Sequence, residues 1–228
     1  MSKILIIVTA HAALGNTGEK TGLWFEELTT PYYTFLDGGA KVTIATLPGG
    51  QIPLDPRSVA AGGKNPASVE RFIRDEAAMR QVKNSLKLAD VSVRDFDAVL
   101  IPGGHGAMWD LASSRELGEF LTDAWARGEV VASVCHGPAG LVRARDEEGK
   151  PLVAGKKISA FSNSEEEQMK LAKVVPFLLE SRLRELKADY RSGPDFQPFA
   201  VRDGRLVTGQ NPSSSEKVAR LVLAALAP

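Results

Sequence analysis

The sequence predicts an α/β fold in which a doubly wound, mostly parallel sheet carries helices on both faces and so forms three layers. Apolar, β-branched runs such as Ile4–Val8 and Val130–Val134 have no polar side, which is typical of strands buried on both faces. These runs alternate with segments whose apolar residues recur at helical spacing. Right-handed crossovers between such units make the strands parallel and place helices on either side of the sheet.

The first strand–helix–strand unit occupies the first 46 residues. Ile4–Val8 predicts the first strand, and Leu23–Leu36 predicts a helix that Pro31 interrupts. The pair Gly38–Gly39 ends this helix, because glycine adopts the backbone conformation found just beyond helix C-termini. Lys41–Thr46 alternates polar and apolar residues and predicts the second strand.

The same pattern returns later in the chain. Asp97–Ile101 and Val130–Val134 predict two more buried strands, and Ser114–Ala126 predicts the helix between them. The pair Asp203–Gly204 between two apolar runs indicates a β-hairpin. Ser214–Leu226 predicts a final amphipathic helix whose first serines suit capping.

Two stretches interrupt the alternation. Pro48–Asp90 contains Pro-Gly turns and a polar helical segment over Ser68–Ser85, so we interpret it as an insertion that covers one end of the sheet. Arg145–Phe161 is rich in turn residues. A length of 228 residues fits one α/β domain, residues 1–228, that includes this insertion.

Charge and cysteine content exclude several classes of protein. The chain has 28 basic and 28 acidic side chains, and this balance argues against a nucleic-acid or membrane-surface partner. The apolar run Ile4–Val8 is too short for a signal-peptide core, and no run approaches the length of a membrane span. One cysteine allows no internal disulfide and fits a reducing compartment. We therefore expect a cytoplasmic protein.

The strand Val130–Val134 leads directly into Cys135, followed by His136, Gly137 and Pro138. A strand, a sharp turn and a helix start are the parts of a nucleophile elbow. A helix N-terminus behind the turn would lower the pKa of the thiol toward the reactive thiolate. The alternative is a buried structural cysteine, since cysteine is often buried. The His-Gly-Pro sequence favours a functional thiol.

A second glycine-rich turn follows the strand Asp97–Ile101. It reads Pro-Gly-Gly-His-Gly and contains Gly103, Gly104 and His105. Glycines let backbone amides approach a ligand, so this loop could supply half of an oxyanion hole, with the amide of His136 as the other half. A plain tight turn is an equally good interpretation of the loop alone. The loop lacks the pattern of a phosphate-binding or dinucleotide-binding loop.

The three histidines each follow a predicted strand. His11, His105 and His136 are therefore expected at the same edge of the sheet. Each could equally be an ordinary polar loop residue. No two of them have the i, i+4 spacing of a helical metal site, so we expect no metal.

The acidic candidates form two groups, Glu26–Glu27 and Glu165–Glu167. Capping and the helix dipole explain most acids near helix starts. A buried carboxyl beside a thiol could also donate and later shuttle a proton.

Together these motifs resemble the superfamily of the Parkinson's-associated deglycase, the PfpI-type intracellular proteases and the glutathione-independent glyoxalase III enzymes. Four segments carry the resemblance over nearly the whole chain: the elbow Val-Cys-His-Gly-Pro, the loop Ile-Pro-Gly-Gly-His-Gly, the early segment Thr21-Gly22 to Glu27, and Thr208–Ser214. The insertion and the uninterrupted elbow point to the heat-shock chaperone/glyoxalase III branch. The resemblance implies a flavodoxin-like fold.

The resemblance also assigns site residues. It implies that Cys135 is the nucleophile and His136 its histidine, that Glu27 rather than Glu26 is the carboxyl partner of the thiol, and that Glu166 in the run Glu165–Glu167 orients the histidine. The implied oxyanion and substrate-binding groups are Gly104, Gly103 and His105, together with the amide of His136. Some relatives hold a metal on two histidines and a carboxylate, but the sequence shows no matching positions.

The implied function is a cofactor-independent glyoxalase of the D-lactate dehydratase class. Such an enzyme converts methylglyoxal and related 2-oxoaldehydes to lactate through a hemithioacetal on Cys135, without metal, glutathione or nucleotide. The alternatives are a stress-responsive chaperone or redox sensor that binds unfolded clients, a protein deglycase, and a cysteine peptidase. A homodimer is expected, because relatives are often dimers.

Overall fold

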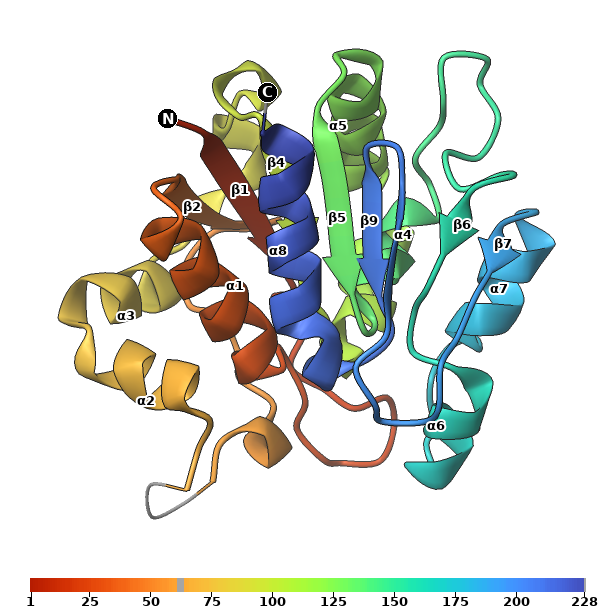
Figure 1. Ribbon diagram of the computed structural model, residues 1–228. Coiled ribbons are helices and arrows are strands. Elements are labelled where there is room, and N and C mark those ends of the chain that lie inside the picture. Colours follow the sequence, from red (N-terminus) through yellow and green to blue (C-terminus); the bar gives the residue numbers. More distant parts are fainter. Residues whose placement is uncertain (61–63, 228) are drawn as a thin grey trace.

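A seven-stranded sheet with strand order β3-β2-β1-β4-β5-β9-β8 forms the centre of the computed structural model, which describes residues 1–60 and 64–227 (Figure 1). All neighbouring strands are parallel except β8 and β9, which form an antiparallel hairpin. The predicted doubly wound α/β fold is therefore confirmed. The strands are β1 Lys3–Val8, β2 Lys41–Thr46, β3 Leu86–Lys87, β4 Ala98–Ile101, β5 Val130–Val134, β8 Ala200–Asp203 and β9 Leu206–Gly209.

Helices cover both faces of the sheet. One face carries α1 (Phe25–Asp37) and α8 (Ser215–Leu226), which lie in front of the sheet in Figure 1; the other carries α4 (Asp110–Ser113) and α5 (Arg115–Ala126). Successive residues of β1 point to opposite faces, so alternate residues join two separate apolar cores. This is why the strand is apolar throughout.

The smaller elements surround this centre. The remaining helices are α2 (Ala67–Arg74), α3 (Glu76–Lys83), α6 (Asn163–Gln168) and α7 (Leu179–Glu185), and a two-stranded parallel sheet pairs β6 (Lys157–Ile158) with β7 (Asp189–Tyr190). The single-turn 3₁₀ helices are η1 (Pro56–Ser58), η2 (Leu88–Asp90), η3 (Val93–Asp95), η4 (His105–Met108), η5 (Gly137–Leu141) and η6 (Pro212–Ser214). None of the helices in the described ranges is both long and apolar enough to cross a membrane.

Helix α1 differs from its prediction in two ways. It begins at Phe25, two residues later than expected, and it continues through Pro31 to Asp37 without interruption. Proline removes one helical hydrogen bond, but Pro31 is buried together with most of the helix. Burial of the flanking apolar side chains offsets that loss. The predicted stop is correct, because Gly39 adopts a left-handed backbone just after the helix.

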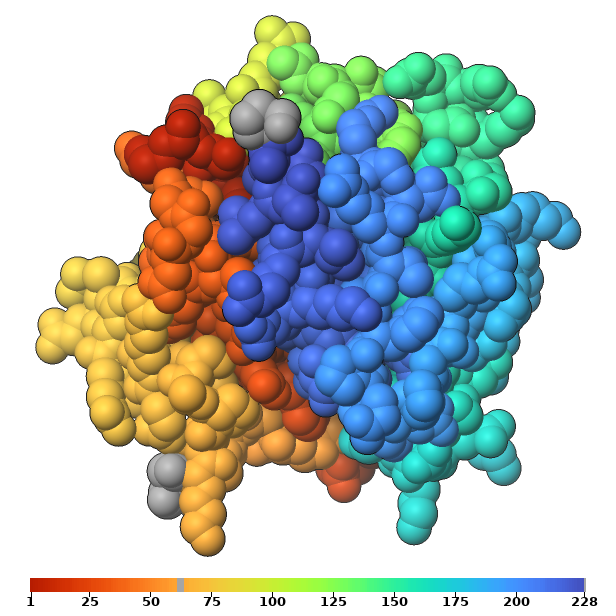
Figure 2. All heavy atoms as spheres, viewed as in Figure 1, coloured from red at the N-terminus to blue at the C-terminus, as the bar shows by residue number. Residues whose placement is uncertain are grey.

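The predicted helical segment over residues 68–85 forms two helices, α2 and α3. Asp75 separates them, and its side chain accepts a hydrogen bond from the amide of Ala78 at the start of α3. Phe72 packs α2 against Tyr32 and Tyr33 of α1 through edge-on aromatic contacts. Figure 2 shows this part of the predicted insertion packed beside α1. Residues 61–63 of the insertion lie outside the described ranges.

Two details near the C-terminus also differ from expectation. The hairpin turn consists of Gly204 and Arg205, while Asp203 still pairs with Leu206 in the strands. No serine side chain caps α8; Ser214 and Asn211 instead exchange hydrogen bonds around η6.

The packing of α2 on α1 leads to a stability prediction. Replacing Phe72, which is fully buried, by alanine should lower the free energy of unfolding by about 3–5 kcal/mol, because it removes an aromatic side chain from a filled core. Chemical denaturation monitored by circular dichroism measures the loss. Ile73 follows in the same helix and is 43% exposed, so Ile73→Ala is the matched control and should cost far less. Equal losses in the two variants would contradict this account of the packing.

Candidate active site

The chain turns sharply where β5 ends, and Cys135 lies at that turn. Cys135 has a left-handed backbone with φ of 59°, a strained conformation for a residue with a side chain. Its amide donates to the carbonyl of Gly209 in β9, and its carbonyl accepts from the amide of Phe161. A Cβ on Gly137 would lie 2.0 Å from the carbonyl oxygen of Ile101, so only glycine allows the turn to approach β4. The structure thus contains the predicted nucleophile elbow.

His136 and Glu166 complete a line of contacts that begins at the thiol. The Sγ atom of Cys135 lies 3.3 Å from Nδ1 of His136, and Nε2 of His136 lies 2.7 Å from Oε2 of Glu166. Glu166 is in the first turn of α6, whose start Ser162 caps. Among the three acids of the run, Glu166 is therefore the one that meets the histidine. A carboxylate, an imidazole and a nucleophile in this order form the arrangement of a catalytic triad.

His105 contacts the same carboxylate from the other side. Its Nε2 lies 2.8 Å from Oε1 of Glu166, and its ring centroid is 4.1 Å from that of His136. Burial, reinforced by the neighbouring His136, lowers the pKa of His105 to about 4, so this ring is neutral at physiological pH. Burial alone would raise the pKa of Glu166, but its interactions with His136 and His105 outweigh this and lower it. An ionised carboxylate therefore lies between two buried histidines.

Glu27 reaches the thiol from the first turn of α1. Its Oε2 accepts a hydrogen bond of 2.6 Å from the amide of Gly103, while its buried Oε1 has no hydrogen-bond partner within the described residues. Burial raises the pKa of Glu27 to about 8, so the carboxyl is protonated at neutral pH. Glu26 is only partly buried, and the hydrogen bond from the Gly103 amide goes to Glu27. The choice of Glu27 over Glu26 agrees with this geometry.

The expected lowering of the thiol pKa is wrong. Burial raises the pKa of the Cys135 thiol, and Glu27 raises it further, although an amide hydrogen bond from Gly104 acts in the opposite direction. Cys135 is 3% exposed, and the helix behind it is the short η5. The dipole of such a short helix does not compensate for loss of water around a thiolate. The resting thiol is therefore protonated.

The two glycines of the predicted oxyanion loop have different roles. The amide of Gly103 is already bound to Glu27, so it is not free for a substrate. Gly104 has a left-handed φ of 90°, and a Cβ there would lie 2.1 Å from the carbonyl oxygen of Gly22. Its amide faces the sulfur of Cys135. The amide of His136 makes no backbone hydrogen bond within the described ranges. Gly104 and His136 thus remain the candidate oxyanion donors.

His11 does not join the other two histidines. Its ring stacks on Trp109, with ring centroids 5.2 Å apart, and its Nε2 contacts the carbonyl of Ala13. His11 does lie at the expected edge, because it follows β1 and a Cβ on Gly106, next to His105, would lie 2.6 Å from the His11 carbonyl oxygen. Its ring, however, contacts neither Glu166 nor the other two histidines in the hydrogen bonds and ring contacts of the described residues.

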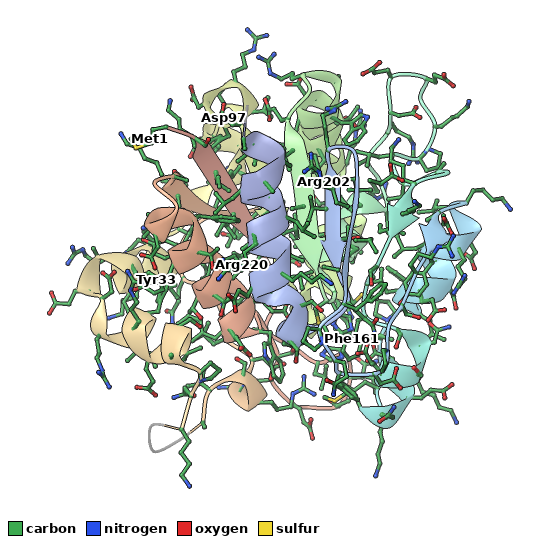
Figure 3. All side chains as sticks on the ribbon, in the orientation of Figure 1. Met1, Tyr33, Asp97, Phe161, Arg202 and Arg220 are labelled. Atoms are coloured by element: carbon green, nitrogen blue, oxygen red, sulfur yellow. The ribbon has the colours of Figure 1, made fainter. Side chains whose placement is uncertain are left out.

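A cavity of about 140 Å³ opens onto the thiol and is mostly apolar. Its lining comprises Trp24, Gly104, His105, Cys135, His136, Phe161, Met169, Phe196 and Pro212. Phe161, labelled in Figure 3, lies beyond the carboxyl ends of β5 and β9, and its ring packs on His136. Sequence reasoning missed the five residues of this wall: Trp24, Phe161, Met169, Phe196 and Pro212. They come from five separate segments, four loops and the helix η6, and no local pattern marks them as the wall of a cavity.

Glu166 and the two histidines that contact it have side chains of the kind that bind metals. His105, His136 and Glu166 place ligand atoms within 4.8 Å of one another, which corrects the expectation that no such trio exists. A metal would need a free lone pair on each histidine nitrogen that faces it. Both Nε2 atoms instead contact the ionised Glu166, which only accepts hydrogen bonds, so both must carry a proton. In this arrangement the trio does not fit a metal ion.

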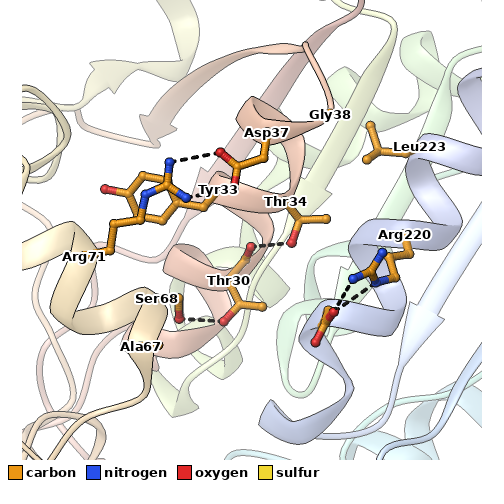
Figure 4. A pocket seen from close by; sticks show the side chains of 11 residues that line it. Thr30, Tyr33, Thr34, Asp37, Gly38, Ala67, Ser68, Arg71, Arg220 and Leu223 are labelled. Atoms are coloured by element: carbon orange, nitrogen blue, oxygen red, sulfur yellow. Dashed lines mark hydrogen bonds and ion pairs between the residues drawn. The ribbon is translucent and has the colours of Figure 1, made fainter.

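A larger hollow lies elsewhere, between α1, α2 and α8, with a volume of about 540 Å³ (Figure 4). Its charges are paired: Arg71 binds Asp37, and Arg220 binds Glu216. It contains neither cysteine nor histidine. The smaller cavity is therefore the candidate active site.

Comparisons with known proteins agree with the fold and the motifs. The model of the DJ-1/PfpI family matches residues 22–225. Glyoxalase 3 of Candida albicans is 30% identical over 99% of this chain and 98% of its own length. The X-ray structure of the Francisella tularensis Rapid Encystment Protein 24 kDa is 36% identical, with a TM-score of 0.95 over the whole of both chains. The crystal structure of C. albicans glyoxalase III is 30% identical, with a TM-score of 0.86 over 98% of this chain and 97% of that one. The chain belongs to the DJ-1/PfpI family.

Proposed function

We propose that the protein is a glutathione-independent glyoxalase that converts methylglyoxal and related 2-oxoaldehydes to lactate. One observation carries this: a small apolar cavity brings a neutral thiol, an imidazole held by an ionised carboxylate, and a protonated carboxylic acid to the same point. The full-length relatives named glyoxalase 3 or glutathione-independent glyoxalase support it. A three-carbon substrate suits the size of the cavity.

In the first step the thiol of Cys135 adds to the aldehyde carbon. Nδ1 of His136 takes the thiol proton as the C–S bond forms, and Glu166 stabilises the resulting imidazolium through Nε2. This coupled transfer is needed because the resting thiol is protonated. The amides of Gly104 and His136 bind the developing alkoxide. The proton then passes from His136 to that oxygen and gives a neutral hemithioacetal.

In the second step a proton moves between the two substrate carbons. Neutral His136 removes the proton from the hemithioacetal carbon while the acid of Glu27 protonates the ketone oxygen, and an enediol forms. His136 then protonates the second carbon, and the first carbon's hydroxyl returns a proton to Glu27. The product is a lactoyl thioester. One carbon is oxidised and its neighbour reduced, so no external electron acceptor is required.

Water then hydrolyses the thioester. His136 is again the base, the C–S bond breaks, and the departing sulfur recovers a proton from His136 as lactate leaves. Because the thiol belongs to the protein, the cycle consumes only water and the 2-oxoaldehyde. Glutathione is unnecessary because the thiol of Cys135 forms the hemithioacetal that the thiol of glutathione would otherwise form.

The geometry favours this reaction over a peptidase. A cavity of about 140 Å³ over a sulfur that is 3% exposed leaves no room for a folded or extended peptide. A deglycase would use the same thiol on a related small carbonyl compound. Chaperone activity is less well supported, because the exposed apolar residues Ile73 and Leu86 of the predicted insertion are isolated. A cytoplasmic location and a homodimer stay predictions; the single reduced thiol supports the first.

The nucleophile prediction concerns Cys135. Cys135→Ala should reduce lactate formation from methylglyoxal by more than about 1,000-fold, because no other cysteine can form the thioester. The measurement is lactate yield by enzymatic assay, without glutathione, beside wild-type protein. Circular dichroism should show an unchanged fold. Absent turnover in the wild type, or equal turnover in the variant, rejects the proposal.

The acid prediction concerns Glu27. Its pKa of about 8 means that the carboxyl holds its proton below that pH and loses it above, so kcat should fall as pH rises through about 8. Glu27→Gln should lower kcat about 100-fold and remove this alkaline limb. Glu26→Gln is the matched control: it should keep the rate and the alkaline limb, with the limb moved slightly to lower pH because the charge of Glu26 helps to raise the pKa of Glu27. An identical limb in wild type and Glu27→Gln would show that another group causes it.

A further inference from the structure

Arg57 connects the predicted insertion to the candidate active site. It lies in η1 (Pro56–Ser58), and its Nη2 is 3.3 Å from Nδ1 of His105. The opposite nitrogen of the same ring is 2.8 Å from Glu166. A continuous line of contacts therefore leads from the guanidinium through His105 to Glu166 and on to His136.

The position of the guanidinium is fixed from behind by Asp55. The Nε and Nη2 atoms of Arg57 donate to the two carboxylate oxygens of Asp55 over 2.9 and 2.6 Å. Asp55 is fully buried and also accepts from the hydroxyl of Thr21. The side chain of Arg57 is 33% exposed, yet its planar group is held by two parallel bonds. A flexible surface arginine would lack this second anchor.

Hydrogen-bond roles along the line are determined by chemistry. A guanidinium only donates, so Nδ1 of His105 must accept and cannot carry a proton. An ionised carboxylate only accepts, so Nε2 of His105 must carry the proton. His105 is therefore neutral and donates in one direction. The charged and titratable groups that face it are Glu166, Arg57 and His136. Glu166 favours a second proton on the ring, whereas Arg57 and a protonated His136 oppose it.

A second proton on His105 would change the site. The ring would become a cation in direct contact with Glu166 and would compete with His136 for the charge of that carboxylate. His136 would then be a weaker base toward the thiol, because its imidazolium would be less stabilised. A group that donates a hydrogen bond to Nδ1 of His105 therefore prevents its protonation and keeps His136 a stronger base.

We propose that Arg57 is a positioning residue that keeps His105 a neutral donor to Glu166 and thereby reserves the carboxylate's charge for His136. The consequence for rate rests on the proposed glyoxalase function; the state of His105 does not. Arg57 does not itself line the cavity and reaches the site only through His105, so its effect should appear in kcat rather than in substrate binding.

The kinetic test replaces Arg57 by methionine, which keeps the chain length and removes the donor. The assay is run at pH 5, where a His105 pKa raised by about one unit from about 4 would leave about half of the rings doubly protonated. At that pH we expect kcat about twofold lower than in wild type and KM changed less than about twofold. The double variant Asp55→Asn/Arg57→Met avoids leaving a buried charge unpaired and should give the same loss if the single variant folds poorly. The control is Arg71→Met, which breaks the ion pair with Asp37 far from the site and should keep the wild-type kcat. An unchanged kcat in the Arg57 variants overturns the proposal.

A second measurement does not depend on activity. Nitrogen NMR of the ring atoms reports the protonation of each histidine, and the chain has three, so His11→Gln simplifies the assignment. At pH 5.5 wild-type His105 should remain neutral with the proton on Nε2, because its pKa is about 4. In Arg57→Met about a quarter of His105 should be doubly protonated, since loss of a nearby cation raises the pKa by about one unit. An unchanged His105 overturns the proposal whatever the kinetics show, and inactive wild-type protein with the expected spectra rejects only the glyoxalase function.

Discussion

The candidate active site depends on a carboxylate that is buried yet ionised. Glu166 lies between two imidazole rings and accepts a hydrogen bond from each, which compensates for its removal from water. Its charge is what orients His136 and makes that ring a base. Without a second donor the same carboxylate would carry an uncompensated charge in an apolar pocket. His105 therefore stabilises the charge of Glu166 by donating a hydrogen bond to it, although His105 does not contact the sulfur.

The topology of the sheet brings these groups together. The chain reverses its direction of strand addition between β1 and β4, so the loops after β1, β4 and β5 meet beyond the carboxyl ends of the strands. The loop after β4 supplies Gly103, Gly104 and His105, and the loop after β5 supplies the elbow. The two loops pack without space for side chains, as the contact of Gly137 with Ile101 shows. Residues remote in sequence thus become neighbours through two glycine turns.

Sequence reasoning located the strands, the elbow and the acid in the run Glu165–Glu167, because each depends on a local pattern or an ordered motif. It could not find the aromatic wall, since Phe161 and Phe196 belong to loops whose paths long-range packing decides. The start of α6 was indicated by the acids Glu165–Glu167 near an expected helix start, and Ser162 does cap that helix. The strands β6 and β7 and the helix α7 were missed, because two to seven residues are too few to show a period. The predicted lowering of the thiol pKa was also wrong, because it too depends on long-range packing. Helix position is visible in sequence, but burial is not, and burial had the larger effect on Cys135.

A protonated, buried thiol is consistent with a nucleophile that is formed only when needed. A permanently ionised cysteine would be open to oxidation and to reaction with any electrophile. In the proposed mechanism the thiolate develops as the substrate arrives, because proton transfer to His136 and attack on the carbonyl occur together. The acid of Glu27 stays protonated for the same reason that the thiol does, since burial disfavours charge on both. One physical condition, exclusion of water from the elbow, thus keeps the thiol and the acid in the forms that the proposed reaction requires, while the hydrogen bonds from His105 and His136 keep Glu166 ionised.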